Sequence, residues 1–304
     1  MKTAIFGCGI IANRVALGFK NIINNELVGF ASRDIEKAKE YANKYNVKEF
    51  GDYDYFLNKK EIDAIYICTY NLNHYELIKR CLEHKKHVIC EKPMVLSSKD
   101  CDELFVVAKQ NNVLLMEALK SVFLPITNKI KVIIHNNLIG NIHHIEASFT
   151  RNGNHSVDHW INDTRCGVLK DLGNYCVGTV NYLLETTPTI EYKYKNNSLE
   201  YSDKSAELIL DYDGIKAHIL VSNEYDGDSS LRIYGDNGYI VVNDFWKTGK
   251  GYYISNKQRY EIDEELINDF HYEIQHFTDC VNNNILESPI MSYKASRDII
   301  SINE

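Results

Sequence analysis

A glycine-rich turn near the N-terminus is the first pattern whose spacing could bind a ligand. The letters GCGIIA at residues 7–12 follow a β-branched run and open a segment of helical spacing. Gly7 allows a tight turn from strand to helix, Gly9 lacks the Cβ that would block a pyrophosphate, and Ala12 permits close packing of the helix on the strand. The helix N-terminus would direct its unpaired N–H groups at the phosphates. An ordinary glycine-rich turn is the alternative. The residues that we expect to contact a dinucleotide are Gly7, Gly9, Ile10, Ile11 and Ala12.

The segment after the second strand-like run, residues 27–31, could select between the two nicotinamide dinucleotides. Ser32 can donate a hydrogen bond to a phosphate, and Arg33 can pair with that phosphate or stack on an adenine. A carboxylate here would instead accept hydrogen bonds from the ribose 2′-OH and repel a 2′-phosphate, and Asp34 lies close enough to do so. We expect NADP(H) to be preferred, with NAD(H) possible. A solvated charge at a helix start is the alternative for Arg33.

Two further clusters carry acid–base side chains. The letters EKP at residues 91–93 end a strand-like run at 87–90, and ligands of open α/β sheets bind at the carboxyl ends of the strands. Asp171 and Tyr175 are four residues apart, which places both on one face of a helix, and a glycine between them would keep the backbone accessible. Taken singly, these residues also fit a solvated lysine, a helix N-cap and a core tyrosine. The residues that we expect on the rim beside Lys92 are Thr69, Asn71, His74 and Glu91.

Short strands and helices must position these residues. Over the first 120 residues, β-branched runs alternate with segments of helical spacing, which is typical of a parallel sheet with helices on both faces. Farther on, the turns Asp213-Gly214 and Asn237-Gly238 separate alternating runs and predict antiparallel hairpins. The fold class is therefore α/β, with a Rossmann-type doubly wound domain over residues 1–120 and an α+β substrate and dimerisation domain over residues 121–304. The strands expected in the first domain are 3–6, 26–31, 64–68, 87–90 and 113–116, and the helices include 35–45, 74–83 and 99–110.

Composition narrows the class of protein. The 304 residues exceed one typical domain of roughly 100–200 residues, so two domains are expected. The net charge, 34 − 42 = −8, disfavours nucleic acid, whose phosphates need a dense Lys/Arg surface. No apolar run approaches the roughly 18 residues that span a bilayer, and Gly7 interrupts the N-terminus too early for a signal peptide. Eight cysteines without a C-x-x-C pair are typical of reduced thiols. We therefore expect a cytoplasmic protein with no nucleic-acid or membrane partner.

Three motifs in this order resemble those of the GFO/IDH/MocA oxidoreductase family: G-x-G-x-x-A at residues 7–12, E-K-P at 91–93 and D-x-G-x-[HY] at 171–175. The letters MEA at residues 116–118, F-x-P at 123–125 and the tyrosine of the third motif resemble the branch of dimeric dihydrodiol dehydrogenases. The resemblance implies an α+β domain with a large, mainly antiparallel open sheet, whose outer face forms a homodimer or homotetramer. It also implies that the bond between the lysine and the proline of E-K-P is often cis.

The resemblance further implies an NAD(P)-dependent dehydrogenase or reductase. Hydride would pass between a nicotinamide and a hydroxyl or keto carbon of a small polar substrate such as a sugar, a polyol or a cyclic diol. We assign Tyr175 as the acid–base, Lys92 as its electrostatic and proton-relay partner and Asp171 as the orienting residue. Lys92 as the proton donor is the alternative assignment, and a non-catalytic dinucleotide-binding sensor is the alternative function. The glycine-rich segment usual before Asp171 is reduced, and Val122 stands where an arginine is usual, so the substrate's identity does not carry over.

The segment before Asp171 offers candidates for the substrate pocket, with a loop held by local packing as the alternative. His155 and His159 have the i,i+4 spacing of metal ligands, but no H-E-x-x-H or cysteine pattern accompanies them, and hydride transfer needs no Lewis acid. We therefore expect no metal. The residues that we expect to contact substrate are His155, Trp160 and Arg165.

Overall fold

The computed structural model describes residues 1–153, 159–197 and 200–304. The chain divides into two compact units, each with its own sheet. The first unit comprises residues 1–118 together with 270–297, and the second comprises residues 119–269 together with 298–304.

The first unit has a six-stranded sheet in which all five neighbouring strand pairs are parallel, in the order β3-β2-β1-β4-β5-β6. The strand order reverses between β1 and β4, and dinucleotides bind at such a switch point in doubly wound sheets. The predicted Rossmann-type sheet is thus confirmed, and β3 is an addition that three residues were too few to reveal. The strands are β1 (Lys2–Phe6), β2 (Glu26–Ala31), β3 (Glu49–Gly51), β4 (Ala64–Ile67), β5 (His87–Glu91) and β6 (Leu115–Ala118).

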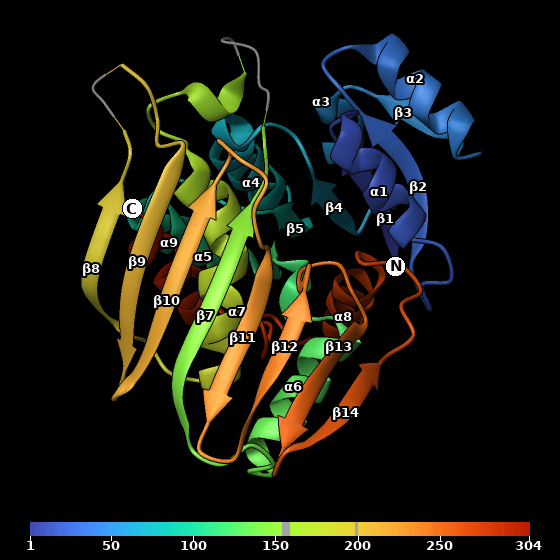
Figure 1. The fold of residues 1–304 in the computed structure, drawn as a ribbon. Coiled ribbons are helices and arrows are strands. Elements are labelled where there is room, and N and C mark those ends of the chain that lie inside the picture. Colours follow the sequence, from blue (N-terminus) through green and yellow to red (C-terminus); the bar gives the residue numbers. More distant parts are fainter. Residues whose placement is uncertain (154–158, 198–199) are drawn as a thin grey trace. The chain divides into compact units, whose positions relative to one another are not determined.

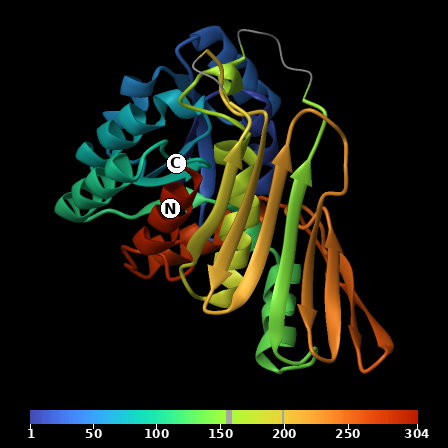
Figure 2. The same ribbon diagram turned by 60° about the vertical axis from the view of Figure 1, so that its left-hand side comes forward.

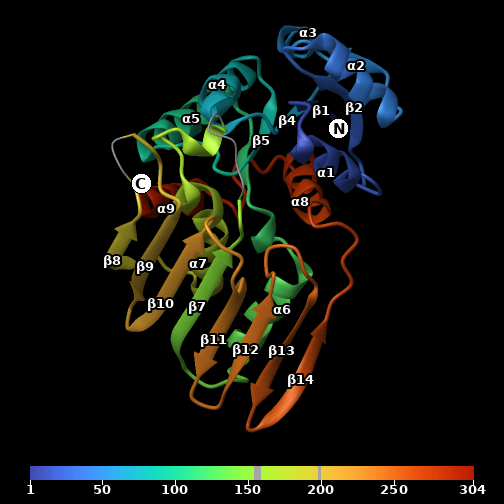
Figure 3. The same cartoon turned by 45° about the horizontal axis from the view of Figure 1, so that its top comes forward.

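Helices of this unit begin where the sequence supplies caps. The Asp34 carboxylate accepts a hydrogen bond from the Lys37 N–H, and the Ser97 hydroxyl accepts one from the Asp100 N–H, so each closes the first turn of its helix. Helices α1 and α8 are in contact, although α8 lies late in the sequence (Figure 3). The helical segments are α1 (Ile10–Gly18), α2 (Ile35–Lys44), α3 (Tyr53–Leu57), the 3₁₀ turn Asn71–Asn73, α4 (His74–Glu83), α5 (Ser98–Asn111) and α8 (His271–Asn282).

The second unit has an eight-stranded sheet in the order β14-β13-β12-β11-β7-β10-β9-β8. Only the β7–β10 pair is parallel among the pairs of this sheet in the described chain, so the mainly antiparallel prediction is confirmed. Both predicted hairpin turns are present, with Asp213 and Gly214 at φ +53° and +98° between β9 and β10. The strands are β7 (Ile142–Thr150), β8 (Thr189–Lys195), β9 (Ser205–Tyr212), β10 (Ile215–Ser222), β11 (Ser230–Gly235), β12 (Gly238–Asn243), β13 (Lys250–Ser255) and β14 (Gln258–Asp263).

Helices α6 (Pro125–His135) and α7 (Asn174–Leu184) pack behind this sheet in the view of Figure 1, and the face toward the viewer is bare in the described part of the unit (Figure 1 and Figure 2). Alternate residues of β9 and β10 are buried, which is the pattern of a sheet with one covered face. The last helix, α9 (Tyr293–Asn303), belongs to the first unit up to residue 297 and to the second unit from residue 298. Short turns at Lys120–Val122 and Trp160–Asn162 complete the unit.

Candidate functional site

The glycine turn between β1 and α1 has the geometry that a dinucleotide requires. Gly7 has φ +107°, and a Cβ there would lie 2.7 Å from the Cys68 carbonyl oxygen, so the turn excludes larger residues. A Cβ at Gly9 would meet no atom within 4 Å, so the space beside this residue is open. Ile10 follows at the first position of α1 with 83% of its surface exposed. The turn therefore fits a dinucleotide pyrophosphate approaching the N-terminus of α1.

Two side chains that the sequence pattern did not indicate, Tyr41 and Asn13, hold this turn by hydrogen bonds. The Tyr41 hydroxyl donates to the Gly9 carbonyl oxygen at 3.0 Å, and the Asn13 side-chain amide lies 3.3 Å from the same oxygen. The Asn13 amide also donates to the Tyr41 hydroxyl at 2.8 Å. The Gly9 peptide is thus held in one orientation by α1 and α2 together. The turn pattern reveals the glycines, but nothing in it indicates a tyrosine 32 residues farther on.

The segment after β2 separates the roles of its polar residues. The Asp34 carboxylate accepts the Lys37 N–H at 3.2 Å as the N-cap of α2, and the Ser32 hydroxyl oxygen accepts the Asp34 N–H at 3.1 Å. Arg33 is exposed, and its positive charge opposes the burial that raises the pKa of Tyr53. The Asp34 carboxylate is therefore engaged as the cap of α2, and the exposed guanidinium of Arg33 belongs to the residue before it.

Glu91, the last residue of β5, and the three residues after it form the segment 91–94, which we call the E-K-P loop. Its Lys92-Pro93 bond is cis, as the family resemblance implied. The Met94 N–H donates to Glu117 Oε1 at 3.0 Å, and the Pro93 carbonyl oxygen lies 3.0 Å from His74 Nδ1. Lys92 itself is half-buried at the carboxyl end of β5. The loop that carries the candidate lysine is therefore fixed by buried side chains from α4 and β6.

His74 is placed differently from the expectation of a cofactor contact. Its side chain is 1% exposed, and its second ring nitrogen, Nε2, lies 3.1 Å from the Thr69 carbonyl oxygen. Both ring nitrogens thus face backbone carbonyls of the loops that follow β4 and β5. Burial lowers the pKa of His74. Its geometry is that of a residue that positions the two loops. Asn71 is also buried, whereas Thr69 is half-buried.

Glu117 is a buried acid that the sequence analysis used only as part of a family signature. It is 1% exposed on β6, and burial raises its pKa from 4.5 to about 7. The positive charge of Lys92 opposes this rise and the negative charge of Glu91 adds to it. The sequence signal for its role was a lone carboxylate within the apolar run of β6.

Asp171 and Tyr175 lie where the second unit's main helix begins. Asp171 belongs to a short π-helical turn, Leu169–Gly173, and Tyr175 lies in the first turn of α7. The expected regular helix is therefore wrong over its first residues. Gly173 is buried, and a Cβ there would lie 2.7 Å from the Leu169 side chain, so close packing explains this glycine rather than an accessible backbone.

Asp171 has a charged neighbour, and Tyr175 has aromatic neighbours. Arg151, directly after β7, donates from Nη2 to Asp171 Oδ2 at 3.1 Å, and nothing in the sequence pattern indicated this role. The Asp171 side chain is only 7% exposed, so this ion pair is partly shielded from water. Tyr175 is buried, with its ring centroid 5.8 Å from that of Phe149 and 6.4 Å from that of Trp246. The carboxylate is thus oriented and the tyrosine ring confined.

The predicted substrate residues have local partners. Arg165 is exposed and makes two hydrogen bonds to the Asp163 carboxylate, at 2.8 and 2.9 Å, which lower the pKa of Asp163 to about 2. The Trp160 ring lies 5.3 Å from the His159 ring. These contacts match the alternative of local packing. His155 lies outside the described residues.

The structure also shows the state of the cysteines and the arrangement of possible metal ligands and long helices. All eight cysteines are free thiols and buried. Within the described ranges, no group of three or more His, Cys, Asp or Glu residues is arranged to hold a metal, and no helix has the length and apolarity to cross a membrane.

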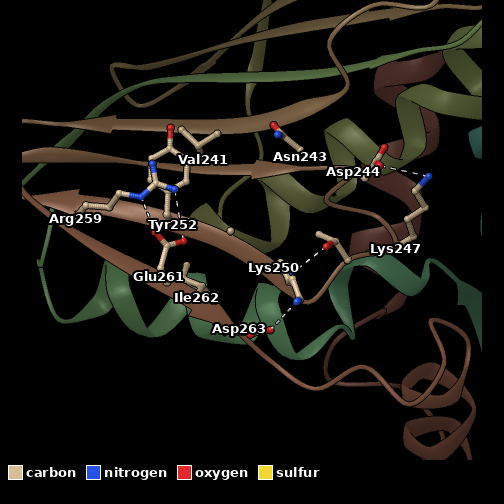
Figure 4. A pocket seen from close by; sticks show the side chains of 12 residues that line it. Val241, Asn243, Asp244, Lys247, Lys250, Tyr252, Arg259, Glu261, Ile262 and Asp263 are labelled. Carbon is tan, nitrogen blue, oxygen red and sulfur yellow. Dashed lines mark hydrogen bonds and ion pairs between the residues drawn. The ribbon is translucent and has the colours of Figure 1, made fainter.

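A cavity of about 680 Å³ lies in the second unit over strands β12 to β14 (Figure 4). The Arg259 guanidinium lies 3.7 Å from the Tyr252 ring centroid and 2.5 Å from Glu261 Oε1 on its wall. Lys250 and Asp263 form another pair there, at 3.7 Å. The cavity shares no residue with the three motifs, so we do not place the reaction in it.

Comparisons with known proteins assign the chain to a family. Residues 1–119 match the NAD-binding Rossmann-fold model of the GFO/IDH/MocA oxidoreductases, and residues 127–241 match the model of the C-terminal domain of the same proteins. The chain belongs to the GFO/IDH/MocA oxidoreductase family. It is an NAD(P)-dependent oxidoreductase by this membership, which favours the catalytic prediction over the non-catalytic sensor.

Similar proteins agree with this assignment over almost the whole chain. The chain is 29% identical to trans-1,2-dihydrobenzene-1,2-diol dehydrogenase of Xenopus tropicalis, covering 99% of this chain and 95% of that protein. It is 28% identical to the scyllo-inositol 2-dehydrogenase (NADP(+)) IolU of Bacillus subtilis, covering 100% and 95%. The solved structure of a 3-ketoreductase from Actinomadura kijaniata with NADP and TDP-benzene shares the fold, with TM-score 0.90, 22% identity and coverage of 100% and 95%. The family and the fold class predicted from the sequence are therefore confirmed.

Proposed function

We propose that this chain is an NADP(H)-preferring dehydrogenase or reductase that acts on a hydroxyl or keto carbon of a small polyol, sugar or cyclic diol. The observation that carries the cofactor preference is the engagement of Asp34 as the cap of α2. Because Asp34 Oδ1 already closes the helix turn, only the other carboxylate oxygen is left to accept from a ribose 2′-OH. Ser32 and Arg33 supply a hydroxyl and a guanidinium for a 2′-phosphate. IolU, a relative, is named for NADP(+).

The residues of the first unit fit a dinucleotide, because the space at Gly9 is open and the Gly7 turn excludes a side chain. The turn at Gly7, Gly9, Ile10, Ile11 and Ala12 would hold the pyrophosphate, and the rim at Thr69, Asn71, Glu91 and Lys92 would hold the nicotinamide end. When bound, the nicotinamide supplies the hydride donor or acceptor.

The chain's own residues would handle the proton. A carbinol carbon that loses hydride leaves a carbonyl, so its hydroxyl proton must pass to a base within hydrogen-bond reach. Tyr175 would take that proton in oxidation and return it in reduction. The ammonium of Lys92 would stabilise the tyrosinate, since a nearby positive charge favours the ionised form. Asp171, oriented by Arg151 at 3.1 Å, would hold the substrate hydroxyl or the lysine. Lys92 as the direct proton donor is the competing assignment.

The substrate class is supported by the named activities of the relatives, which include a dihydrodiol and an inositol dehydrogenase. Trp160 and Arg165 belong to this proposal as substrate contacts of the second unit, although Arg165 would have to exchange its Asp163 partner for substrate. His155 is proposed with them from its sequence position alone.

The bare face of the second unit's sheet is proposed to pair with a second copy of the chain, as a homodimer or homotetramer. The paired charges and the Arg259–Tyr252 stack around the cavity on this face give it both polar and aromatic groups. Free cysteines fit a cytoplasmic location, because thiols stay reduced there. Sedimentation of wild type and of the Arg259→Glu variant tests the interface, which predicts a smaller species for the variant.

Turnover is tested by mixing the protein with NADPH or NADH and a panel of ketoses, inososes and cyclic hydroxyketones, following the absorbance of the reduced nicotinamide. Tight binding of NADPH with no turnover on any panel member would favour the sensor instead. Lys92→Met and Tyr175→Phe separate the two proton assignments, because the true donor should show the larger loss of kcat. Near-normal kcat in both variants would refute the proposed chemistry.

The cofactor preference has its own test. Arg33→Ala should weaken NADPH binding by about ten-fold to a hundred-fold, as expected for losing a charge-assisted hydrogen bond, and leave NADH binding nearly unchanged. Lys39→Ala is the matched control, because Lys39 is an exposed cation farther along α2. Equal efficiency of wild type with both cofactors would contradict the preference.

A further inference from the structure

Three buried side chains form a hydrogen-bonded chain beneath the E-K-P loop. The Tyr66 hydroxyl lies 2.8 Å from Glu91 Oε1 and 3.0 Å from Glu273 Oε1. Tyr66 and Glu273 are fully buried and Glu91 is 8% exposed. The three residues come from β4, β5 and α8 of the first unit, and Glu91 directly precedes Lys92.

The number of hydrogens in this chain constrains its charge. A tyrosine hydroxyl carries one hydrogen, so it donates to one carboxylate at a time. Its contact with the second carboxyl is a hydrogen bond only when that carboxyl is protonated and donates to the phenolic oxygen. Two ionised carboxylates would leave one pair of oxygens, at 2.8 or 3.0 Å, without a hydrogen between them. In a buried site such a contact is strongly unfavourable.

We propose that Glu91, Tyr66 and Glu273 retain one shared carboxyl proton at neutral pH and together position the E-K-P loop. Tyr66 donates to one glutamate and accepts from the other, so the chain carries one negative charge rather than two. Tyr66 and Glu273 then act on the reaction through Glu91 and Lys92, as positioning residues. The part that concerns Lys92 rests on the proposed function, whereas the shared proton does not.

The charged and titratable groups around the chain are consistent with a retained proton. Burial, followed by the negative charges of Glu273 and Glu91, raises the pKa of Tyr66 well above its ordinary value, so the phenol keeps its hydrogen. Burial likewise raises the pKa values of Cys68 and Cys90, which therefore add no charge.

Two further groups, Lys92 directly after β5 and Glu117 on β6, act on the same region. Glu117 is within electrostatic reach of both Glu91 and Lys92, and burial raises its pKa as it raises the pKa of Tyr66. Glu91 and Glu117 therefore lie near the carboxyl ends of neighbouring strands beside the lysine ammonium, and Glu273 contacts Tyr66 of the same sheet from α8. A proton held between Glu91 and Glu273 lowers the negative charge that this interior must bear.

Infrared spectroscopy of the whole protein, without cofactor or substrate, tests the shared proton directly. A protonated carboxyl absorbs apart from carboxylates, and its band shifts when the protein is transferred to D₂O. We expect wild type at neutral pH to show such a band. Glu117→Gln should keep the part of the band that comes from the shared proton, and Glu273→Gln or Glu91→Gln should remove that part. Glu103→Gln, at a half-buried glutamate paired with Lys79, is the matched control and should leave the band unchanged. A wild type without the band, or a band unchanged in both Glu273→Gln and Glu91→Gln, would overturn the proposal.

Kinetics test the positioning role. Glu273→Gln resembles the protonated carboxyl, because its amide can donate to the Tyr66 oxygen, so it should keep kcat/KM within a few-fold of wild type. Tyr66→Phe removes the bridge and should lower kcat/KM by about ten-fold or more, as for a lost hydrogen bond to a charged group. It should also shift the pH profile of kcat, which a general loss of folded protein would not do. Normal kinetics in Tyr66→Phe would refute the positioning role. If no substrate is turned over at all, the proposed function fails while the infrared result still decides the shared proton.

Discussion

The buried carboxyl of Glu117 makes a quantitative prediction about stability. Its pKa is raised from 4.5 to about 7 by burial, and a rise of about 2.5 pKa units corresponds to about 3 kcal/mol. The sign follows from proton binding. Between these pKa values the unfolded chain has released the proton while the folded protein retains it, so the free energy of unfolding falls as pH rises. The loss begins near the unfolded value of 4.5 and is complete above about 7.

Replacing Glu117 by glutamine should remove this pH dependence. The amide oxygen can still accept the Met94 N–H, so the E-K-P loop keeps its hydrogen bond at low pH. The unfolding free energy of Glu117→Gln should therefore rise relative to wild type by up to about 3 kcal/mol as pH passes from about 4.5 to above 7. Urea unfolding of both proteins at a series of pH values measures this difference.

The matched control is again Glu103→Gln. The Glu103 side chain is 42% exposed, and its hydrogen bond from Lys79 lowers its pKa, so any difference from wild type should be small and of opposite sign. A difference between wild type and Glu117→Gln that stays constant with pH would refute the buried, uncharged carboxyl. A difference that shrinks as pH rises would refute it as well.

Three other substitutions separate structural from functional roles. Gly9→Val should leave the melting temperature nearly unchanged, because a side chain there meets open space, and should abolish dinucleotide binding measured by titration calorimetry. Gly7→Val should instead lower the melting temperature, since its Cβ would lie 2.7 Å from the Cys68 carbonyl oxygen; a stable Gly7→Val would contradict the strained turn. Arg151→Met should lower kcat by about ten-fold or more by releasing the Asp171 carboxylate, with cofactor affinity unchanged, and an unaltered kcat would show that Asp171 needs no orientation.

The sequence predicted those elements whose structure is determined by neighbouring residues in the chain. The turn at residues 7–12 was identifiable because its glycines act through the backbone of the turn itself, and the Asp213-Gly214 turn because both residues adopt positive φ. The three residues of β3 are too few for any periodicity to appear. The π-helical turn at Leu169–Gly173, in which Gly173 packs closely against the Leu169 side chain, could not be told from a regular α-helix by residue spacing alone.

The side chains behind the candidate residues could not be predicted for a different reason. Tyr66 and Glu273 are 207 residues apart, and their contact exists only because α8 joins the first unit. Arg151, directly after β7, contacts Asp171, which lies 20 residues farther along the chain. In each case the sequence contains a common residue type, and only the tertiary arrangement gives it a role. Motifs therefore identify the groups proposed to touch ligands better than the groups that orient them.

The imidazole of His74, like the Tyr66 hydroxyl, faces two hydrogen-bond partners, so the number of hydrogens it carries decides which contacts are hydrogen bonds. Its ring nitrogens lie 3.0 Å from the Pro93 carbonyl oxygen and 3.1 Å from that of Thr69, and both oxygens are acceptors. A neutral imidazole has one N–H and serves one of them, whereas only the imidazolium serves both. Burial and the charge of Lys92 lower the pKa of His74 while the carbonyls raise it, so the neutral ring is favoured and one carbonyl at a time receives the hydrogen. A buried polar group costs stability unless it is hydrogen-bonded. The buried polar side chains around the E-K-P loop are therefore best explained by their role in holding the backbone that carries Lys92.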